Sequence, residues 1–256
     1  MRVVVVRSVR GGGGSSTVAA NLAAAMQQLG YSCLLLDLCQ SNDLRLHASV
    51  DPCEPDGWAR RLVADQAWEV AVFGAGGSCR VIPFGELDGD AYERFLAFPQ
   101  EALVAFAEQV QASFSPAADW LIVDAPPLVS QHSAAFESML HAFSKSASLR
   151  LLAVPPEAPA YTSLRFSTRV RNAAADYHLL LNRAAPEVAI NRDLSLVFRQ
   201  EFASRMVPIR IGADSALAEA FASLRTVFQY SPDSEAAREF HALAIWCQAS
   251  LVGERS

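Results

Sequence analysis

Short runs of apolar residues recur along the chain, and glycine, proline or polar residues bound each of them. The runs are continuous rather than alternating, which is the pattern of strands that are buried on both faces of a sheet. We predict strands at residues 3–6, 33–36, 81–84, 121–123, 149–154, 178–181 and 207–211. A sheet built from such strands needs helices over both of its faces.

Between the predicted strands, apolar residues return at steps of three and four, which is the spacing along one face of an α-helix. In the first such segment, Val18, Leu22 and Met26 share a face, and Gly30 follows as the predicted C-cap. Helices are predicted at residues 16–29, 101–112, 134–144, 163–175, 215–228 and 234–251. Strands that alternate with helices predict an α/β fold with a single doubly wound, mainly parallel sheet, in one domain that spans residues 1–256.

The composition narrows the class of protein. Hydrophobic residues make up 52% and charged residues 19% of the chain, which predicts a large buried core and excludes a disordered chain. No stretch reaches the ~18 consecutive apolar residues of a membrane span, and charge returns at Arg7, so we expect a soluble, cytoplasmic protein without a signal peptide. The net charge of −6 argues against nucleic-acid binding through a broad basic surface.

A glycine run separates the first predicted strand from the first predicted helix. Glycines let the backbone turn its N–H groups around a phosphate, and a helix N-terminus adds about +0.5 of a charge. A flexible linker has a similar composition, but only ten residues precede the run, too few for a folded unit that a linker would join. The residues of this predicted phosphate-binding loop are Arg10, Gly11, Gly12, Gly13, Gly14, Ser15, Ser16 and Thr17.

The loop resembles the deviant Walker A motif of the MinD/ParA ATPases, Lys-Gly-Gly-x-Gly-Lys followed by two hydroxyl residues. Arg10 takes the position of the signature lysine, and Ser15 takes that of the phosphate-loop lysine. Lys145 is the only lysine among the 21 basic residues. Any chemistry that requires a lysine must therefore use Lys145 or proceed without one.

The resemblance to this family continues along the chain. Residues 34–37 resemble its second strand with the family aspartate, and residues 120–127 resemble the Walker B strand and the turn after it. Residues 179–183 resemble the strand whose final asparagine reads adenine. Residues 211–214 resemble the turn beside the adenine, with Gly212 where the family usually has proline.

The resemblance implies ATP and Mg²⁺ as ligands. Ser16 would bind the ion directly, and Asp37 and Asp124 would hold its bound waters. The implied residues around the adenine are Asn182, Arg183 and Asp214. Taken without the resemblance, an acidic residue at the end of a buried strand can simply cap a neighbouring helix, and an asparagine after a strand is an ordinary turn residue.

One departure from the family pattern affects hydrolysis most. Family members usually carry Asp-x-Asp after the second strand, and the second aspartate orients the attacking water; here Asp37 and Leu38 are followed by Cys39. A thiol is a poor hydrogen-bond acceptor for water, and Ser15 cannot supply the charge of a lysine. We therefore assign no catalytic residue, predict weak or absent hydrolysis, and leave open whether the chain is an enzyme.

The position of Arg10 implies a homodimer around ATP. In the family, the signature residue reaches across the dimer to the partner's nucleotide. Arg10 would then neutralise phosphate in trans, with the two parallel hydrogen bonds that a guanidinium can make.

Further segments resemble one branch of this family, the BcsQ proteins of bacterial cellulose-secretion operons. These segments are residues 57–60, Trp68, residues 82–85 and residues 244–247. The resemblance implies a scaffold for the assembly or regulation of a membrane-bound cellulose synthase, with partner subunits from the same operon. It implies contact with the inner membrane only through those partners, and the net charge of −6 argues against DNA as a partner. The alternatives are an active ParA/MinD-like ATPase that positions cargo or DNA, and a protein that binds no nucleotide.

Three other features allow two interpretations each. A basic helix face at residues 165–171 fits recognition of DNA or of a cyclic dinucleotide, but a solvated surface is favoured. Trp58 and Trp68 fit either partner anchors or the core. Residues 234–251 carry acidic side chains, which favours packing on the core over membrane binding.

Overall fold

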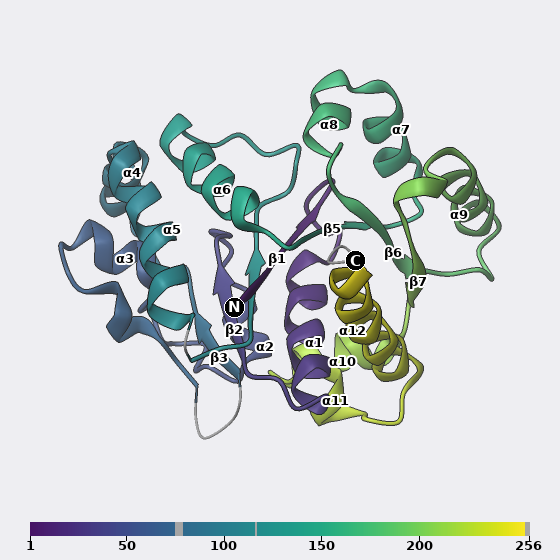
Figure 1. The fold of residues 1–256 in the computed structure, drawn as a ribbon, viewed down its shortest axis with the longest axis horizontal. Helices are drawn as coiled ribbons and strands as arrows, with labels where there is room; N and C mark the ends of the chain where they lie inside the picture. Colours follow the sequence, from purple (N-terminus) through teal and green to yellow (C-terminus); the bar gives the residue numbers. More distant parts are fainter. Residues whose placement is uncertain (75–78, 116, 254–256) are drawn as a thin grey trace.

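The computed structural model describes residues 1–74, 79–115 and 117–253. Its centre is a seven-stranded sheet with the strand order β3-β2-β4-β1-β5-β6-β7, in which all neighbouring strands run parallel (Figure 1). The strands are β1 (Arg2–Ser8), β2 (Cys33–Asp37), β3 (Cys79–Ile82), β4 (Trp120–Asp124), β5 (Leu149–Val154), β6 (His178–Ala184) and β7 (Met206–Gly212). The seven predicted strands and the doubly wound α/β class are confirmed.

Helices cover both faces of this sheet. They are α1 (Ser15–Gln28), α2 (Leu44–His47), α3 (Trp58–Val63), α4 (Gly89–Leu96), α5 (Gln100–Phe114), α6 (Ala134–Ser146), α7 (Ala158–Phe166), α8 (Thr168–Ala173), α9 (Ala189–Glu201), α10 (Ser215–Ala222), α11 (Val227–Tyr230) and α12 (Glu235–Gly253). Two short 3₁₀ helices complete the described elements, at Trp68–Ala71 and Ala203–Arg205.

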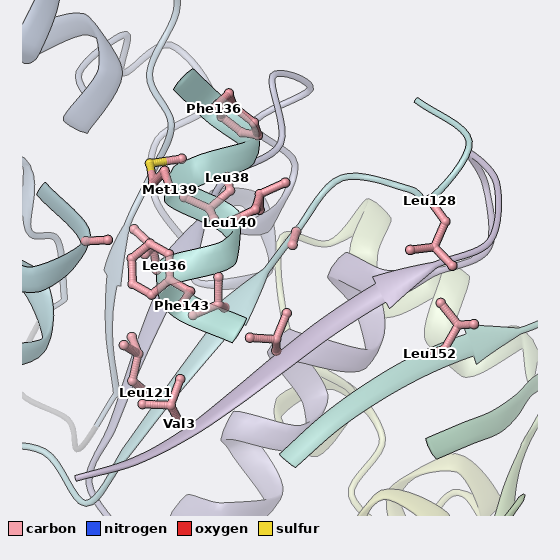
Figure 2. Close-up of a cluster of buried hydrophobic side chains, with 14 of the residues drawn as sticks. Val3, Leu36, Leu38, Leu121, Leu128, Phe136, Met139, Leu140, Phe143 and Leu152 are labelled. Atoms are coloured by element: carbon pink, nitrogen blue, oxygen red, sulfur yellow. The ribbon is translucent and has the colours of Figure 1, made fainter. Parts of the chain in front are cut away.

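Alternation of side chains along β1 explains why both faces are buried. Val5 belongs to a core shared with α5 and α6, whereas Val6 belongs to a second core shared with α1 and α12. Figure 2 shows part of the first core, where Phe143 of α6 lies beside Leu36 and Phe136 lies toward the other end of the same helix. The continuous apolar runs in the sequence reflect this double burial.

Two predicted helices are each divided in the structure. The segment 163–175 divides into α7 and α8, because Ser167 is extended and its hydroxyl accepts a hydrogen bond from the first turn of α8. The segment 215–228 divides into α10 and α11 at Leu224, whose φ is 55°, and Thr226 begins α11 with a capping box. The apolar spacing continues across both breaks, so periodicity alone does not reveal them.

The sequence pattern does not predict α9 or the short helices α2, α3 and α4. The buried residues of α9 are Asn191 and Phe198, so its apolar face is too sparse to stand out. The helices α2 and α3 have four and six residues, which is too few for a helical period to repeat.

Gly30 follows the end of α1 in the left-handed conformation, as predicted. Its φ is 86°, and its N–H donates to the carbonyl of Gln27 at 2.9 Å. The next N–H, that of Tyr31, donates to the carbonyl of Met26 at 3.1 Å. These two hydrogen bonds form a Schellman motif, which favours glycine at this position.

The two ambiguous apolar features belong to the core. Trp58 is 0% and Trp68 is 3% exposed, so neither is available as a partner anchor. In α12, Phe240, Leu243 and Cys247 are buried, and the helix packs against α1 and β7. Within the described ranges, no helix is both long enough and apolar enough to cross a membrane.

Candidate functional site

The candidate site lies at the carboxyl edge of the sheet, where β1, β2 and β4 end side by side. Asp37 at the end of β2 is the register partner of Asp124 at the end of β4. The glycine run leaves the end of β1, next to β4, and α1 begins at Ser15. Parallel strands bring all these residues to one edge, which is where ligands bind in open α/β sheets.

The glycine run is a fixed loop packed against the strands. Gly12 and Gly14 have φ values of 77° and 84°, in the left-handed region that favours glycine. A Cβ on Gly13 would lie 2.6 Å from the Cβ of Ser8, and one on Gly14 would lie 2.4 Å from Nδ2 of Asn182. Three consecutive positions therefore require glycine, which fits a phosphate-binding loop better than a linker.

The N-terminus of α1 is open to an anion. Within the described residues, no side chain caps this helix, and no acidic residue lies in its first turn. The free N–H groups and the helix dipole therefore favour a negatively charged ligand at Ser15 and Ser16. Arg10 is exposed, and its guanidinium makes no hydrogen bond or ion pair to any described residue.

Two residues at the end of β6 hold the glycine loop. The Nδ2 atom of Asn182 donates a hydrogen bond to the carbonyl of Gly13 at 2.9 Å, and Nη1 of Arg183 donates to the carbonyl of Gly12 at 3.0 Å. Asn182 is 3% exposed, and Arg183 has a φ of 56°. An asparagine has a second N–H and a carbonyl oxygen that remain for a base. Contact between Asn182 and adenine stays a prediction.

Asp214 fixes the turn after β7. Its Oδ1 accepts a hydrogen bond from the N–H of Ala216 at 2.9 Å, and its Oδ2 accepts one from the N–H of Ala236 at 3.1 Å. Glu239 holds the same turn, since its Oε2 accepts from the N–H of Gly212 at 2.7 Å. The turn is therefore tied to the start of both α10 and α12, and contact between Asp214 and a nucleotide stays a prediction.

Asp37 and Asp124 form a fully buried acidic pair, and both are 0% exposed. The carboxylate of Asp37 accepts hydrogen bonds from the N–H groups of Cys39 at 2.8 Å and Leu44 at 3.1 Å. Burial, and then the charge of Asp124, nevertheless raise the pKa of Asp37 well above its usual range. Ligand atoms of Asp37, Cys39 and Asp124 lie within 4.8 Å of one another.

The carboxylate of Asp124 makes no well-formed hydrogen bond within the described residues. Neither of its oxygens makes a hydrogen bond to any described residue, although both are buried. Burial raises the pKa of Asp124, and the nearby hydroxyls of Ser16 and Ser15 oppose that shift without reaching hydrogen-bond geometry. A buried carboxylate without a partner is costly, so this site is suited to a cation.

The donor set fits magnesium. Mg²⁺ prefers hard oxygen ligands and keeps several of its waters. The hydroxyl of Ser16 and the carboxylates of Asp37 and Asp124 supply such oxygens from α1, β2 and β4. Because no described residue donates a well-formed hydrogen bond to the carboxylate of Asp124, a magnesium ion or its bound waters would satisfy the two carboxylate oxygens.

Cys39 cannot replace an aspartate as an acceptor. Burial, and then the charges of Asp124 and Asp37, raise the pKa of Cys39 well above its usual range, so the thiol keeps its proton. Its Sγ donates weakly to the carbonyl of Asp124 at 3.8 Å. The thiol therefore acts as a donor toward the chain and offers little to a water molecule.

Sequence reasoning missed the residues that hold the turn after β4. The guanidinium of Arg7 donates to the carbonyls of Pro126 at 2.6 Å and Pro127 at 3.3 Å. Arg169 of α8 donates to the carbonyl of Val129 at 3.0 Å, so this residue is not simply solvated. The available signal was a charged residue directly after the four valines of β1, where the strand ends beside the site.

A parallel sheet, a glycine loop that leads into an open helix N-terminus and two acidic residues at adjacent strand ends together give this chain the fold of the MinD/ParA proteins. Solved structures of MinD proteins share this fold. The cell division ATPase MinD of Pyrococcus furiosus matches with a TM-score of 0.72 at 23% sequence identity. The match covers 100% of this chain and 99% of the MinD chain. MinD of Pyrococcus horikoshii, solved with Mg-ADP, matches with a TM-score of 0.69 at 21% sequence identity. This match covers 95% of this chain and 94% of the MinD chain.

The chain belongs to the BcsQ family. The family model described as "Cellulose biosynthesis protein BcsQ" matches residues 1–248. The BcsQ protein of Salmonella typhi is 32% identical over 257 aligned positions, which cover 100% of this chain and 98% of that protein. The predicted resemblance, to the MinD/ParA class and to its BcsQ branch, is confirmed.

Proposed function

We propose that this protein binds ATP and Mg²⁺, dimerises around the nucleotide and serves as a scaffold in cellulose synthesis. The observation that carries this proposal is the partnerless carboxylate of Asp124, buried beside the open N-terminus of α1. A magnesium–phosphate group would satisfy both features at once. The Mg-ADP complex of the Pyrococcus horikoshii relative supports the choice of ligand.

Each part of the site then has a defined role. The N–H groups of the glycine loop and of α1 bind the phosphates, and Asn182 and Arg183 hold the loop in its shape. Bound magnesium would neutralise phosphate charge, held by Ser16 with Asp37 and Asp124. Arg10 extends from the loop to the nucleotide of a second subunit.

The name of the family supports the biological role. BcsQ relatives are named for cellulose biosynthesis, and the partners we propose are other subunits of the same system. Contact with a membrane would be indirect. The rival function, an active ATPase that positions cargo or DNA, is disfavoured by the protonated thiol of Cys39 and by the net charge of −6.

ATP with Mg²⁺ should raise the melting temperature and convert the protein to a dimer. A ligand present at 100 times its Kd adds about 2.7 kcal/mol of stability. Arg10→Ala should keep most of the thermal shift but remain monomeric, because Arg10 serves the partner's phosphate rather than its own. Differential scanning fluorimetry and light scattering measure the two effects.

The matched control for Arg10→Ala is Arg199→Ala, on the exposed surface of α9. That variant should dimerise normally. A normal ATP-bound dimer of Arg10→Ala would refute the role in trans, and the lack of any thermal shift in the unmodified protein would refute the proposed function.

The site should prefer ATP to GTP, and Asn182→Ala should narrow that preference. The amide contacts both the loop and, in our proposal, the adenine edge, and loss of a bidentate base contact costs about 1–3 kcal/mol. In our proposal Arg183 acts through its hydrogen bond to the carbonyl of Gly12, so Arg183→Ala should weaken the binding of ATP and GTP equally. Calorimetric titration with both nucleotides measures this, and equal affinities in the unmodified protein would contradict it.

A further inference from the structure

The indole of Trp58 contacts the backbone of Asp37, one of the residues of the proposed magnesium site, although Trp58 is not itself part of that site. Trp58 is the first residue of α3 and is 0% exposed. Its Nε1 donates a hydrogen bond to the backbone carbonyl of Asp37 at 2.8 Å. The carboxylate of the same aspartate belongs to the buried acidic pair.

This hydrogen bond replaces a missing strand partner. On the β4 side, β2 stays paired as far as Asp37, but on the β3 side its pairing ends one residue earlier, at Leu36. The carbonyl of Asp37 is therefore left without a strand on one side. A buried carbonyl needs a donor, and the indole N–H supplies it.

The indole itself has little freedom to move. Its ring is stacked on Phe106 of α5 at 4.4 Å between centroids, and it meets the edges or faces of Phe84 at 5.2 Å and Phe95 at 5.7 Å. The backbone N–H of Trp58 donates to the carbonyl of Pro83 at 3.0 Å. The donor is therefore fixed both through its ring and through its backbone.

The start of α3 is packed closely against the loop that follows β3. A Cβ on Gly57 would lie 2.1 Å from the amide nitrogen of Gly85, so only glycine permits this approach. This close contact fixes the position of Trp58, the next residue, along β2, and so the point at which its indole contacts that strand. A shift of α3 would displace the indole from the carbonyl of Asp37.

We propose that Trp58 is a positioning residue for the magnesium site. By holding the peptide group between Asp37 and Leu38, it fixes the direction in which the Asp37 carboxylate leaves β2 and the place where Cys39 follows. The inference rests on the proposed function, since it assigns Trp58 to the ion that accompanies ATP. It concerns affinity for magnesium, not contact with the nucleotide.

Trp58→Phe should weaken the contribution of magnesium to nucleotide binding. Titrating a non-hydrolysable ATP analogue with Mg²⁺ and again with EDTA gives the gain in affinity that magnesium provides. Loss of one net hydrogen bond should reduce this gain about 3- to 10-fold. Affinity in EDTA should stay unchanged.

Trp68→Phe is the matched control. Trp68 lies in the same aromatic cluster, against Phe106 at 5.3 Å, but its indole donates to Gln109 of α5 at 3.1 Å instead of to β2. Both variants lose one indole hydrogen bond and a similar ring volume. If Trp58 only packs the core, the two variants should behave alike.

Each outcome of this comparison decides the inference. A reduced magnesium gain in Trp58→Phe alone supports it, and an equal reduction or none in both variants overturns it. If Trp58→Phe does not fold, benzothienylalanine at position 58 keeps the ring shape without the N–H and should show the same loss. If the unmodified protein gains nothing from magnesium, the proposed function fails, and this inference fails with it.

Discussion

Purified protein with ATP and Mg²⁺ should hydrolyse ATP at least about 10⁴-fold more slowly than a MinD-type ATPase. Two groups that act in the transition state are replaced, and each such contribution is commonly worth about 10²–10³-fold. Ser15 brings no charge to the phosphates, and the pKa of Cys39 is raised, so its thiol keeps its proton. Binding that is equal in the ground state and the transition state does not restore the rate.

Cys39→Asp should raise this rate about 10²-fold, because a carboxylate can orient water where the thiol cannot. Single-turnover hydrolysis with magnesium is the measurement. Cys53→Asp is the control, since Cys53 is an exposed cysteine outside the site. Turnover by the unmodified protein at the level of ordinary MinD-type enzymes would refute the scaffold and favour the ATPase that positions cargo or DNA.

Asp124→Asn should stabilise the protein without nucleotide while abolishing its response to magnesium. The carboxylate is buried, and neither of its oxygens makes a hydrogen bond to any described residue. An amide of the same shape removes an uncompensated charge, which should add about 1–3 kcal/mol to the free energy of unfolding at pH 8. The analogue-binding titration should then show no gain from magnesium.

The stabilisation by Asp124→Asn should depend on pH in a defined direction. Burial raises the pKa of Asp124 in the folded protein to about 7, above the roughly 3.9 of an unfolded aspartate. The folded state thus binds the proton more tightly, and this contribution to stability is complete below about pH 4 and is lost as the pH rises to about 7. The advantage of the asparagine should therefore be small at pH 4 and full at pH 8.

Asp119→Asn is the opposite control. Asp119 lies near the surface, and hydrogen bonds from Ser32 lower its pKa. Its loss should destabilise the protein slightly at neutral pH, and the difference should disappear in acid. Denaturant unfolding across the pH range measures both variants, and a destabilised Asp124→Asn at pH 8 would contradict our view of the site.

The sequence predicted the sheet and the general composition of the site because both depend on local patterns. Continuous apolar runs mark strands buried on two faces, and the glycine run at the end of the first strand marks the loop. Both signals lie within a few neighbouring residues. A parallel sheet places the ends of β2 and β4 at the same edge, and the strand order of the structure, in which β2 and β4 are neighbours, brings Asp37 to Asp124.

Contacts that support the site from other elements could not be predicted in this way. Trp58 reaches Asp37 across 21 residues of sequence, and Asn182 reaches Gly13 across 169. Nothing in the spacing of apolar residues encodes such a distance. The family resemblance assigned Asn182 to the adenine base, and the structure adds a hydrogen bond from Asn182 to the backbone of the glycine loop. The sequence left Trp58 in either the core or a partner contact, and the structure adds a hydrogen bond from Trp58 to the backbone of β2.

The position of β1 in the sheet also sets a delay during synthesis. The first strand is the central one, and Val4 pairs with Ile122 of β4 on one side and with Leu149 of β5 on the other, both of which are synthesised much later. A ribosome that adds about 5–20 residues per second needs roughly 7–30 s to complete both neighbours. Until then at least one side of β1 lacks its partner strand, so the nascent chain must be kept from associating with other chains before the centre of its sheet is complete.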